Sequence, residues 1–315
     1  MRGSERSRDT TSRLWTTIKL RITNYEIRNT GGKKRMKESS EMDFKEASRR
    51  FVDVFGEKEP LVLPIGVKLI PKGKKVPKGT RAIEEYQGVP WCEAVRIAAT
   101  KGEVVVINKE NVGCPAAAIA LGLVDQYNKE PLRGKRKYTD LMTEPAAPAD
   151  FTTGLVYACK DSGNMQFALF GNDDAGRYET LGAALKAISG MKAIQPAIMD
   201  AAVAYQAEKL DITPDVVILA LKPKQALLAI QGYNFLSGNR FEMSTIGIRG
   251  VCADLTAQPF LEQRINGSFF CLGARALGRW GGNLLGLGMP FSIFQQMVSG
   301  MEKSVNGFPF KAYPD

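Results

Sequence analysis

The spacing of apolar residues along the chain predicts a succession of helices and short strands. In residues 42–55, apolar side chains recur every three or four positions, which places them on one face of a helix. Short runs rich in Val, Ile and Leu predict buried strands, at residues 61–70, 103–108 and 215–221. Further helices are predicted where good helix formers follow a proline or form an amphipathic pattern, at residues 90–102, 115–123, 223–236 and 289–304.

The middle of the chain has less regular patterns. Residues 128–150 are polar and proline-rich, which predicts a linker between two halves. Residues 154–160 and 165–171 predict paired strands around a short turn. Residues 180–210 have the composition of a helix, interrupted near Gly190.

The alternation of these elements predicts a mixed α/β fold of the α+β type, in one compact domain. We expect two similar halves, residues 36–150 and 151–315, with short strands in a central sheet and helices covering it. The strand–helix units at residues 103–123 and 215–235 favour some parallel pairing, since such units commonly return the chain to a parallel neighbour.

Basic residues are concentrated at the start of the chain. The net charge is +10, but residues 1–35 hold ten Lys or Arg and three Asp or Glu, while the other 280 residues hold 33 basic and 30 acidic side chains. We interpret residues 1–35 as a disordered, non-native leader before a native start at Met36. The alternative is a basic arm that binds nucleic acid. For the nearly neutral remainder we predict no nucleic-acid partner.

The apolar stretches are shorter than the roughly 18 residues that a membrane span needs, so we predict no membrane partner and a cytoplasmic location. Thiols stay reduced there, which makes the five cysteines metal ligands, nucleophiles or core residues rather than disulfides. The chain has no histidine. This excludes Ser-His-Asp and Cys-His catalysis and histidine-ligated zinc.

Two distant segments repeat one arrangement of cysteines. WCEAV at residues 91–95 is similar to VCADL at residues 251–255. A second cysteine follows each motif, Cys114 in the first copy and Cys271 in the second, and each precedes a run of small residues that ends in Ala-Leu-Gly. The repeat suggests two halves related by a pseudo-twofold axis.

Such halves would bring four cysteines to a shared interface, namely Cys92, Cys114, Cys252 and Cys271. Three interpretations remain open. The thiols pack as small apolar groups, they bind an iron–sulfur cluster or zinc as four soft ligands, or one of them is a reactive thiol at a helix N-terminus. Cys159 has no counterpart in the other half, and we predict that it lies in the core.

Several of these motifs together resemble one known family, the ArCR family or domain of unknown function 169. They are PIGVKL, WCEAV with CPAAAIALGL, DVVILALKPKQALLAIQ, GVCAD and CLGAR. The resemblance covers roughly residues 44–302. It implies that the four cysteines stand at family motif positions, in a cytoplasmic protein of archaea and anaerobic bacteria, and it implies no particular activity.

The sequence thus supports two classes of function and does not decide whether the protein is an enzyme. One is an anaerobe-type redox or metal-binding protein whose four cysteines hold an iron–sulfur cluster or zinc. The other is a binding module or enzyme for an anionic small molecule, with its site between the halves. Backbone N–H groups together with Arg275, Lys68 or Lys222 would contact that ligand.

Overall fold

A computed structural model describes the greater part of the chain. The described residues are 42–55, 61–78, 80, 88–124, 186–187, 190–276 and 278–304. The predicted leader, the predicted linker, the strand pair at residues 154–171 and Cys159 lie outside the described residues.

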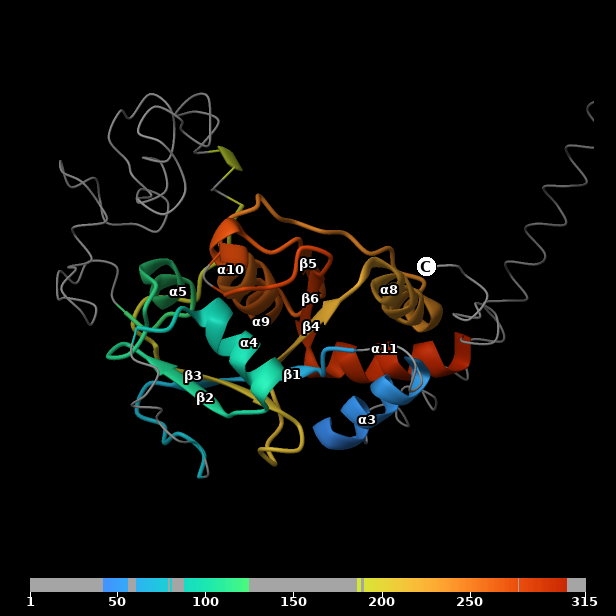
Figure 1. Cartoon of the computed structure of the whole chain (residues 1–315), viewed down its shortest axis with the longest axis horizontal. Coiled ribbons are helices and arrows are strands. Elements are labelled where there is room, and N and C mark those ends of the chain that lie inside the picture. The colour runs from blue at the N-terminus through green and yellow to red at the C-terminus, as the bar shows by residue number, and fades with distance from the viewer. Residues whose placement is uncertain are drawn as a thin grey trace, which may run out of the picture. The chain divides into compact units, whose positions relative to one another are not determined.

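Six strands form one sheet, and helices flank it (Figure 1). The strands are β1 (Ile65–Pro71), β2 (Val105–Asn108), β3 (Met199–Gln206), β4 (Val216–Leu221), β5 (Asn266–Ser268) and β6 (Leu285–Pro290). The helices are α3 (Phe44–Phe55), α4 (Trp91–Lys101), α5 (Pro115–Ala120), α8 (Pro223–Ser237), the π-helix η5 (Gly250–Ala257), α9 (Gln258–Glu262), α10 (Leu272–Ala276) and α11 (Phe291–Ser304). Within the described ranges, no helix is long and apolar enough to cross a membrane.

The mixed α/β class with a helix-covered sheet is confirmed, but the predicted parallel pairing is wrong. The strand order is β2-β3-β1-β4-β6-β5, and every neighbouring pair is antiparallel. A helix that follows a strand does not by itself fix the direction of the neighbouring strands. Strand β4 is followed by α8, yet both of its neighbours, β1 and β6, run antiparallel to it.

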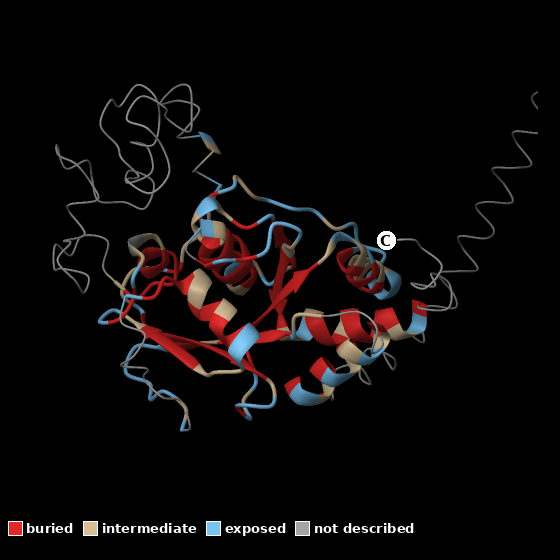
Figure 2. Cartoon of the chain, in the orientation of Figure 1, coloured by how far each residue is buried: buried red, intermediate tan, exposed pale blue. Residues whose placement is uncertain are grey.

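Side chains of the strands alternate between the two faces of the sheet. On each face they pack into a separate buried hydrophobic core. In β4, Val216 and Ile218 belong to one buried cluster, whereas Val217 and Leu219 belong to the other. We call the helices on the first side, α4, α5, η5, α9 and α10, the thiol layer. Those on the second side, α3, α8 and α11, form the aromatic layer. Figure 2 shows buried faces on helices of both layers.

The aromatic layer is built from large interlocking side chains. Phe44 makes edge-on contacts with Tyr205 of β3 and with Phe294 of α11, at ring-centroid distances of 5.7 and 6.4 Å. Phe51 packs against Phe294 at 5.6 Å. Aromatic pairs of this kind add to the stabilisation that their buried area provides.

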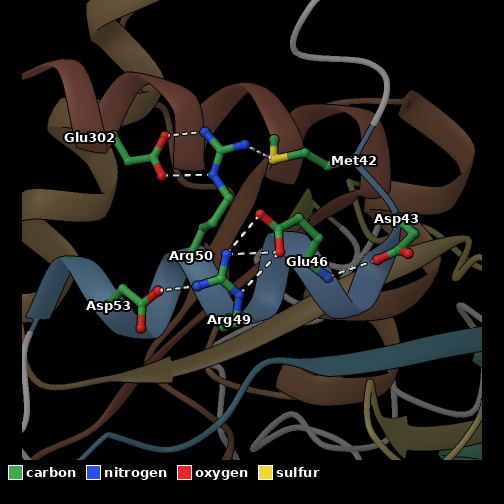
Figure 3. A network of polar contacts seen from close by, with 7 residues as sticks. All are labelled: Met42, Asp43, Glu46, Arg49, Arg50, Asp53 and Glu302. Carbon is green, nitrogen blue, oxygen red and sulfur yellow. Dashed lines mark hydrogen bonds and ion pairs between the residues drawn. The ribbon is translucent and has the colours of Figure 1, made fainter.

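Polar contacts tie α3 to α11 at the edge of this layer (Figure 3). Arg50 donates through Nε to Glu302 of α11 at 2.7 Å and also bonds Glu302 through Nη2. Asp43 caps the start of α3, because its Oδ1 accepts the backbone N–H of Glu46 at 2.7 Å. The bidentate Arg50–Glu302 pair fixes how α3 lies against α11.

The prediction of helix over residues 180–210 is wrong at its C-terminal end, where β3 lies. Its sequence MDAAVAYQ favours helix by composition. In the fold, β3 pairs with both β1 and β2, and seven of its eight residues are buried. Burial on both faces removes the alternation that identifies a strand in a sequence, and the tertiary context overrides the helix propensity.

Strand β6 was not predicted, because its glycines lower the strand propensity of the segment. A Cβ at Gly288 would lie 2.2 Å from the carbonyl oxygen of Leu255, and one at Gly286 would lie 2.3 Å from the Leu255 side chain. Glycine is therefore required where η5 lies directly against the strand. The weak strand propensity of this segment is a consequence of close packing.

The strand order can be described as two groups of three strands. The first group is β2-β3-β1 and the second is β5-β6-β4, and they meet where β1 pairs with β4. In the first group β1 is followed by α4 and the edge strand β2, whereas in the second β4 is followed by α8, η5 and α9 before the edge strand β5. Cys114 and α5 follow β2, and Cys271 and α10 follow β5. The predicted halves, residues 36–150 and 151–315, stay a prediction, because their boundary lies outside the described residues.

Candidate thiol site

The four cysteines of the repeat lie in the thiol layer, each on a different element or at its edge. Cys92 is in the first turn of α4, and Cys252 is in η5. Cys114 directly precedes α5, and Cys271 directly precedes α10. All four are free thiols that belong to or pack against one buried cluster. The predicted position of Cys114 and Cys271 just before short helices is confirmed.

Contacts between the two strand groups bring these cysteines together. Helix α4 contacts α10 and η5, and α5 contacts η5. A Cβ added at Gly278 would lie 3.2 Å from Cys92 Sγ, and one at Gly250 would lie 2.8 Å from the backbone nitrogen of Cys271. Glycine at these positions lets the cysteine-bearing segments approach one another.

Local hydrogen bonds fix the segments around the thiols. Trp280 donates from Nε1 to the carbonyl oxygen of Cys92 at 2.9 Å, and its ring stacks on Phe270 at 4.9 Å. The Cys271 sulfur accepts the backbone N–H of Ala274 at 3.3 Å. Trp91 donates to the hydroxyl of Thr256 in η5 at 3.0 Å and so connects α4 to η5.

Burial favours the neutral form of three of the thiols. It raises the pKa of Cys92, Cys114 and Cys252 above the ordinary value of 9.0. Negative charge on neighbouring thiols raises the pKa of Cys92 and Cys252 further, and Cys114 and Cys271 both contribute to this effect. A thiol activated as a nucleophile has the opposite shift.

Arg249 is a part of this site that the sequence analysis missed. The residue directly precedes η5, is only 7% exposed and has a left-handed backbone with φ of 55°. Its positive charge lowers the pKa of Cys114 and Cys252, against the larger effect of burial. A single arginine carries no sequence signal that separates it from surface arginines.

A buried polar network lies next to Cys252. The sequence did not predict that its residues come together in the fold. Asp254 is 3% exposed and accepts hydrogen bonds from Thr245 at 2.6 Å and from Ser268 at 3.3 Å. Burial raises the pKa of Asp254 to about 7, and the two hydroxyl donors oppose that shift. Asn266 donates to the Asp254 carbonyl oxygen at 3.0 Å and connects the network to β5.

The structure gives Arg275 contacts with the protein backbone. Its guanidinium donates to the carbonyl oxygens of Phe269 at 2.6 Å and Leu284 at 3.0 Å, and also to that of Gly281. It lies over the Phe270 ring at 5.5 Å. Arg275 thus holds the β5–α10 and α10–β6 loops together, and its predicted contact with an anion stays a prediction.

The other two predicted ligand contacts lie at opposite ends of β4. Lys68 lies in β1 between Val67 and Leu69, which belong to the thiol-side core, so it projects to the opposite face. It forms an ion pair with Asp215, just before β4, at 2.7 Å. Lys222 follows the other end of β4, where Leu221 pairs with Leu285, and it directly precedes α8. The predicted anion contacts of Lys68 and Lys222 stay predictions.

A cavity of about 530 Å³ lies elsewhere, between the start of α3 and the loop after β3. An ion pair of 2.7 Å between Lys45 and Glu208 joins two of its lining side chains. None of the three predicted anion contacts lines it.

The described part of the chain contains no group of three or more Cys, Asp or Glu side chains that could hold a metal ion. Thiolates are soft donors of the type that zinc and iron–sulfur clusters use. The predicted zinc or iron–sulfur ligation by the four cysteines therefore stays a prediction.

Comparisons with known proteins agree with the sequence motifs. The profile of the family DUF169, described as uncharacterised ArCR, matches residues 62–300. An uncharacterised protein of Methanocaldococcus jannaschii is 22% identical over 233 residues, which cover 74% of this chain and 82% of the relative. No solved structure matches the chain. Since the matched region includes both cysteine pairs and most of the sheet, the chain belongs to the DUF169 (ArCR) family.

Proposed function

We propose that the protein binds an iron–sulfur cluster through Cys92, Cys114, Cys252 and Cys271. The observation that supports the proposal is that four thiols from four separate elements lie in, or pack against, one buried apolar cluster. Packing alone needs small apolar side chains and does not require sulfur at all four places, since the same layer uses alanine widely.

The electrostatics support a soft metal centre over a free nucleophile. Burial and mutual repulsion raise the thiol pKa values, so iron must displace protons when it binds. A buried site with excluded water protects a cluster and sets its reduction potential. The proposed role is accordingly that of a redox or metal-dependent protein with its centre between the two strand groups.

Anaerobic reconstitution tests the proposal. The purified full chain is incubated with iron, sulfide and a thiol reductant, and bound iron, acid-labile sulfide and visible absorption are then measured. For a cubane cluster held by four cysteines, we expect about four iron and four sulfide per chain. Serine substitutions of Cys92, Cys114, Cys252 or Cys271, made one at a time, should each reduce bound iron severalfold.

Cys159→Ser is the matched control, because it removes the one cysteine outside the set of four. It should bind as much iron as the wild type. A wild-type protein that holds no iron after reconstitution would contradict the proposal. Tight binding of one zinc ion, with no iron bound, would contradict the iron–sulfur cluster and indicate a mononuclear zinc site.

A further inference from the structure

The loop that follows β1 carries a concentration of exposed lysines. Residues 71–80 hold four lysines and no Asp or Glu. All four are exposed, namely Lys72, Lys74, Lys75 and Lys78, and we call residues 72–78 the lysine loop. Within the described residues, none of the four forms an ion pair with a carboxylate. Lys45 and Lys68, by contrast, each pair with a carboxylate at 2.7 Å.

Hydrogen bonds of the backbone hold the lysine loop in place. Lys72 donates its N–H to the carbonyl oxygen of Ile198 at 2.8 Å. Gly73 donates its N–H to Oδ2 of Asp200 at 2.7 Å and has a left-handed backbone with φ of 76°. Lys74 closes a tight turn with a hydrogen bond of 3.0 Å to the carbonyl oxygen three residues earlier. A partner therefore meets lysines on a fixed backbone, and little ordering of the chain opposes its binding.

The lysine loop accounts for the excess positive charge of the chain after residue 35. Residues 36–315 hold 33 basic and 30 acidic side chains, and four of the basic ones lie in the loop. The rest of this region therefore carries no net positive charge. A compact positive cluster on a nearly neutral body attracts an anionic group locally and provides no extended basic surface.

A short acidic segment fits this charge distribution better than an extended polyanion does. A nucleic acid or an anionic membrane would reach beyond the loop, where the chain supplies no net positive charge to bind it. The lysine loop also contains no aromatic residue on which a nucleic-acid base could stack. Carboxylates on a short segment, in contrast, need only the four lysines.

We propose that the lysine loop is a docking site for an acidic segment of a partner protein, rich in Asp and Glu. The inference is independent of the proposed iron–sulfur cluster, because it uses none of the four cysteines. Binding should weaken with salt, since the screening length falls from about 30 Å at 0.01 M to about 8 Å at 0.15 M ionic strength. Each exposed ion pair contributes little, so the four charges together should change the dissociation constant about tenfold.

The test measures binding of a fluorescently labelled octaglutamate peptide to the purified full chain, by fluorescence anisotropy at low salt. The loop variant replaces all four lysines, with Lys72→Gln, Lys74→Gln, Lys75→Gln and Lys78→Gln, and its dissociation constant should rise about tenfold. The matched control removes four positive charges from the start of the chain, with Arg2→Gln, Arg6→Gln, Arg8→Gln and Arg13→Gln. Its dissociation constant should stay near that of the wild type.

Equal losses of affinity in the two variants would assign the binding to net charge and overturn the inference, as would a wild type that does not bind the peptide. Tighter binding of duplex DNA or of vesicles that contain phosphatidylserine, lost in the loop variant, would assign the loop to a nucleic acid or a membrane instead. The loop substitutions are exposed, so unfolding curves of this variant should match those of the wild type. A loss of binding in the folded variant therefore reports the lysine charges.

Discussion

The two faces of one sheet carry layers of different composition. The aromatic layer is filled by large side chains such as Phe51 and Phe294, both fully buried. The thiol layer combines the rings of Trp91, Phe270 and Trp280 with alanines, glycines, free thiols and a buried arginine and aspartate. Large aromatic side chains provide most buried area per residue, whereas small residues let backbones and polar groups approach one another. The comparison indicates that buried polar and thiol groups are concentrated on one face of the sheet, which is the face of the proposed site.

The largest expected effect is in the aromatic layer. Phe294→Ala removes a buried ring that packs on Phe44 and Phe51, and it should lower the free energy of unfolding by about 4 kcal/mol. Chemical denaturation measures the change. Leu227→Ala, at a side chain that is half exposed, is the control and should change stability by at most about 0.5 kcal/mol. Iron bound per folded molecule should not change, and a selective loss of iron would break the separation of roles.

The second largest expected effect is a change of stability with pH, caused by Asp254 in the thiol layer. Burial raises the pKa of Asp254 from 3.8 to about 7, so the folded protein retains a proton that the unfolded chain has released. The bound proton contributes fully to the free energy of unfolding below about pH 4, and this contribution is lost as pH rises to 7. Relative to Asp254→Asn, the free energy of unfolding of the wild type should fall by about 3 to 4 kcal/mol between pH 4 and pH 8. Denaturation curves that run parallel across this range would show that Asp254 is ionised in the fold.

An intermediate effect is expected where the thiol layer contacts the sheet. Gly288→Ala places a Cβ against the backbone of Leu255 and should cost about 2 kcal/mol. It should also reduce iron binding, because η5 carries Cys252. Gly282→Ala is the control, since a Cβ there meets no atom within 4 Å. Thermal unfolding and iron analysis of the two variants give the comparison, and equal behaviour would refute the close packing of η5 on β6.

The smallest effect tests one hydrogen bond beside a thiol. Trp280→Phe keeps an aromatic ring on Phe270 but removes the donor to the Cys92 carbonyl oxygen. We expect a loss of about 1 kcal/mol in unfolding free energy. Amide exchange in α4 should become faster while that in α11 stays constant. Faster exchange in both helices would mean that the two layers do not respond separately.

Local patterns were sufficient for elements that bury one face or whose ends are marked by proline or glycine. The apolar spacing in α3, the proline before α4 and the run of β4 all led to correct elements. Strands β3 and β6 were missed because helix-favouring alanines and packing glycines conceal them. Their conformation depends on neighbours that lie far away in the sequence.

The site was predictable only in part for a similar reason. The repeat identified four cysteines that the fold brings into one layer, because a repeated local pattern survives in the sequence. Arg249 and Trp280 complete that layer without any repeated motif, and the position of Asp254 in the repeat gave no indication of its burial. Lys68 was predicted as a ligand contact, but its position in the sequence gives no indication of which face of the sheet it occupies.

The sequence by itself determined the mixed α/β class, the family and the four cysteines, because these depend on composition, local periodicity and motifs. Only the tertiary structure decided the antiparallel strand order, the separation of the two layers and the burial of Arg249 beside the thiols. These features arise from contacts between residues far apart in the chain. Their free energies depend on which surfaces meet, and no local window of the sequence contains that information.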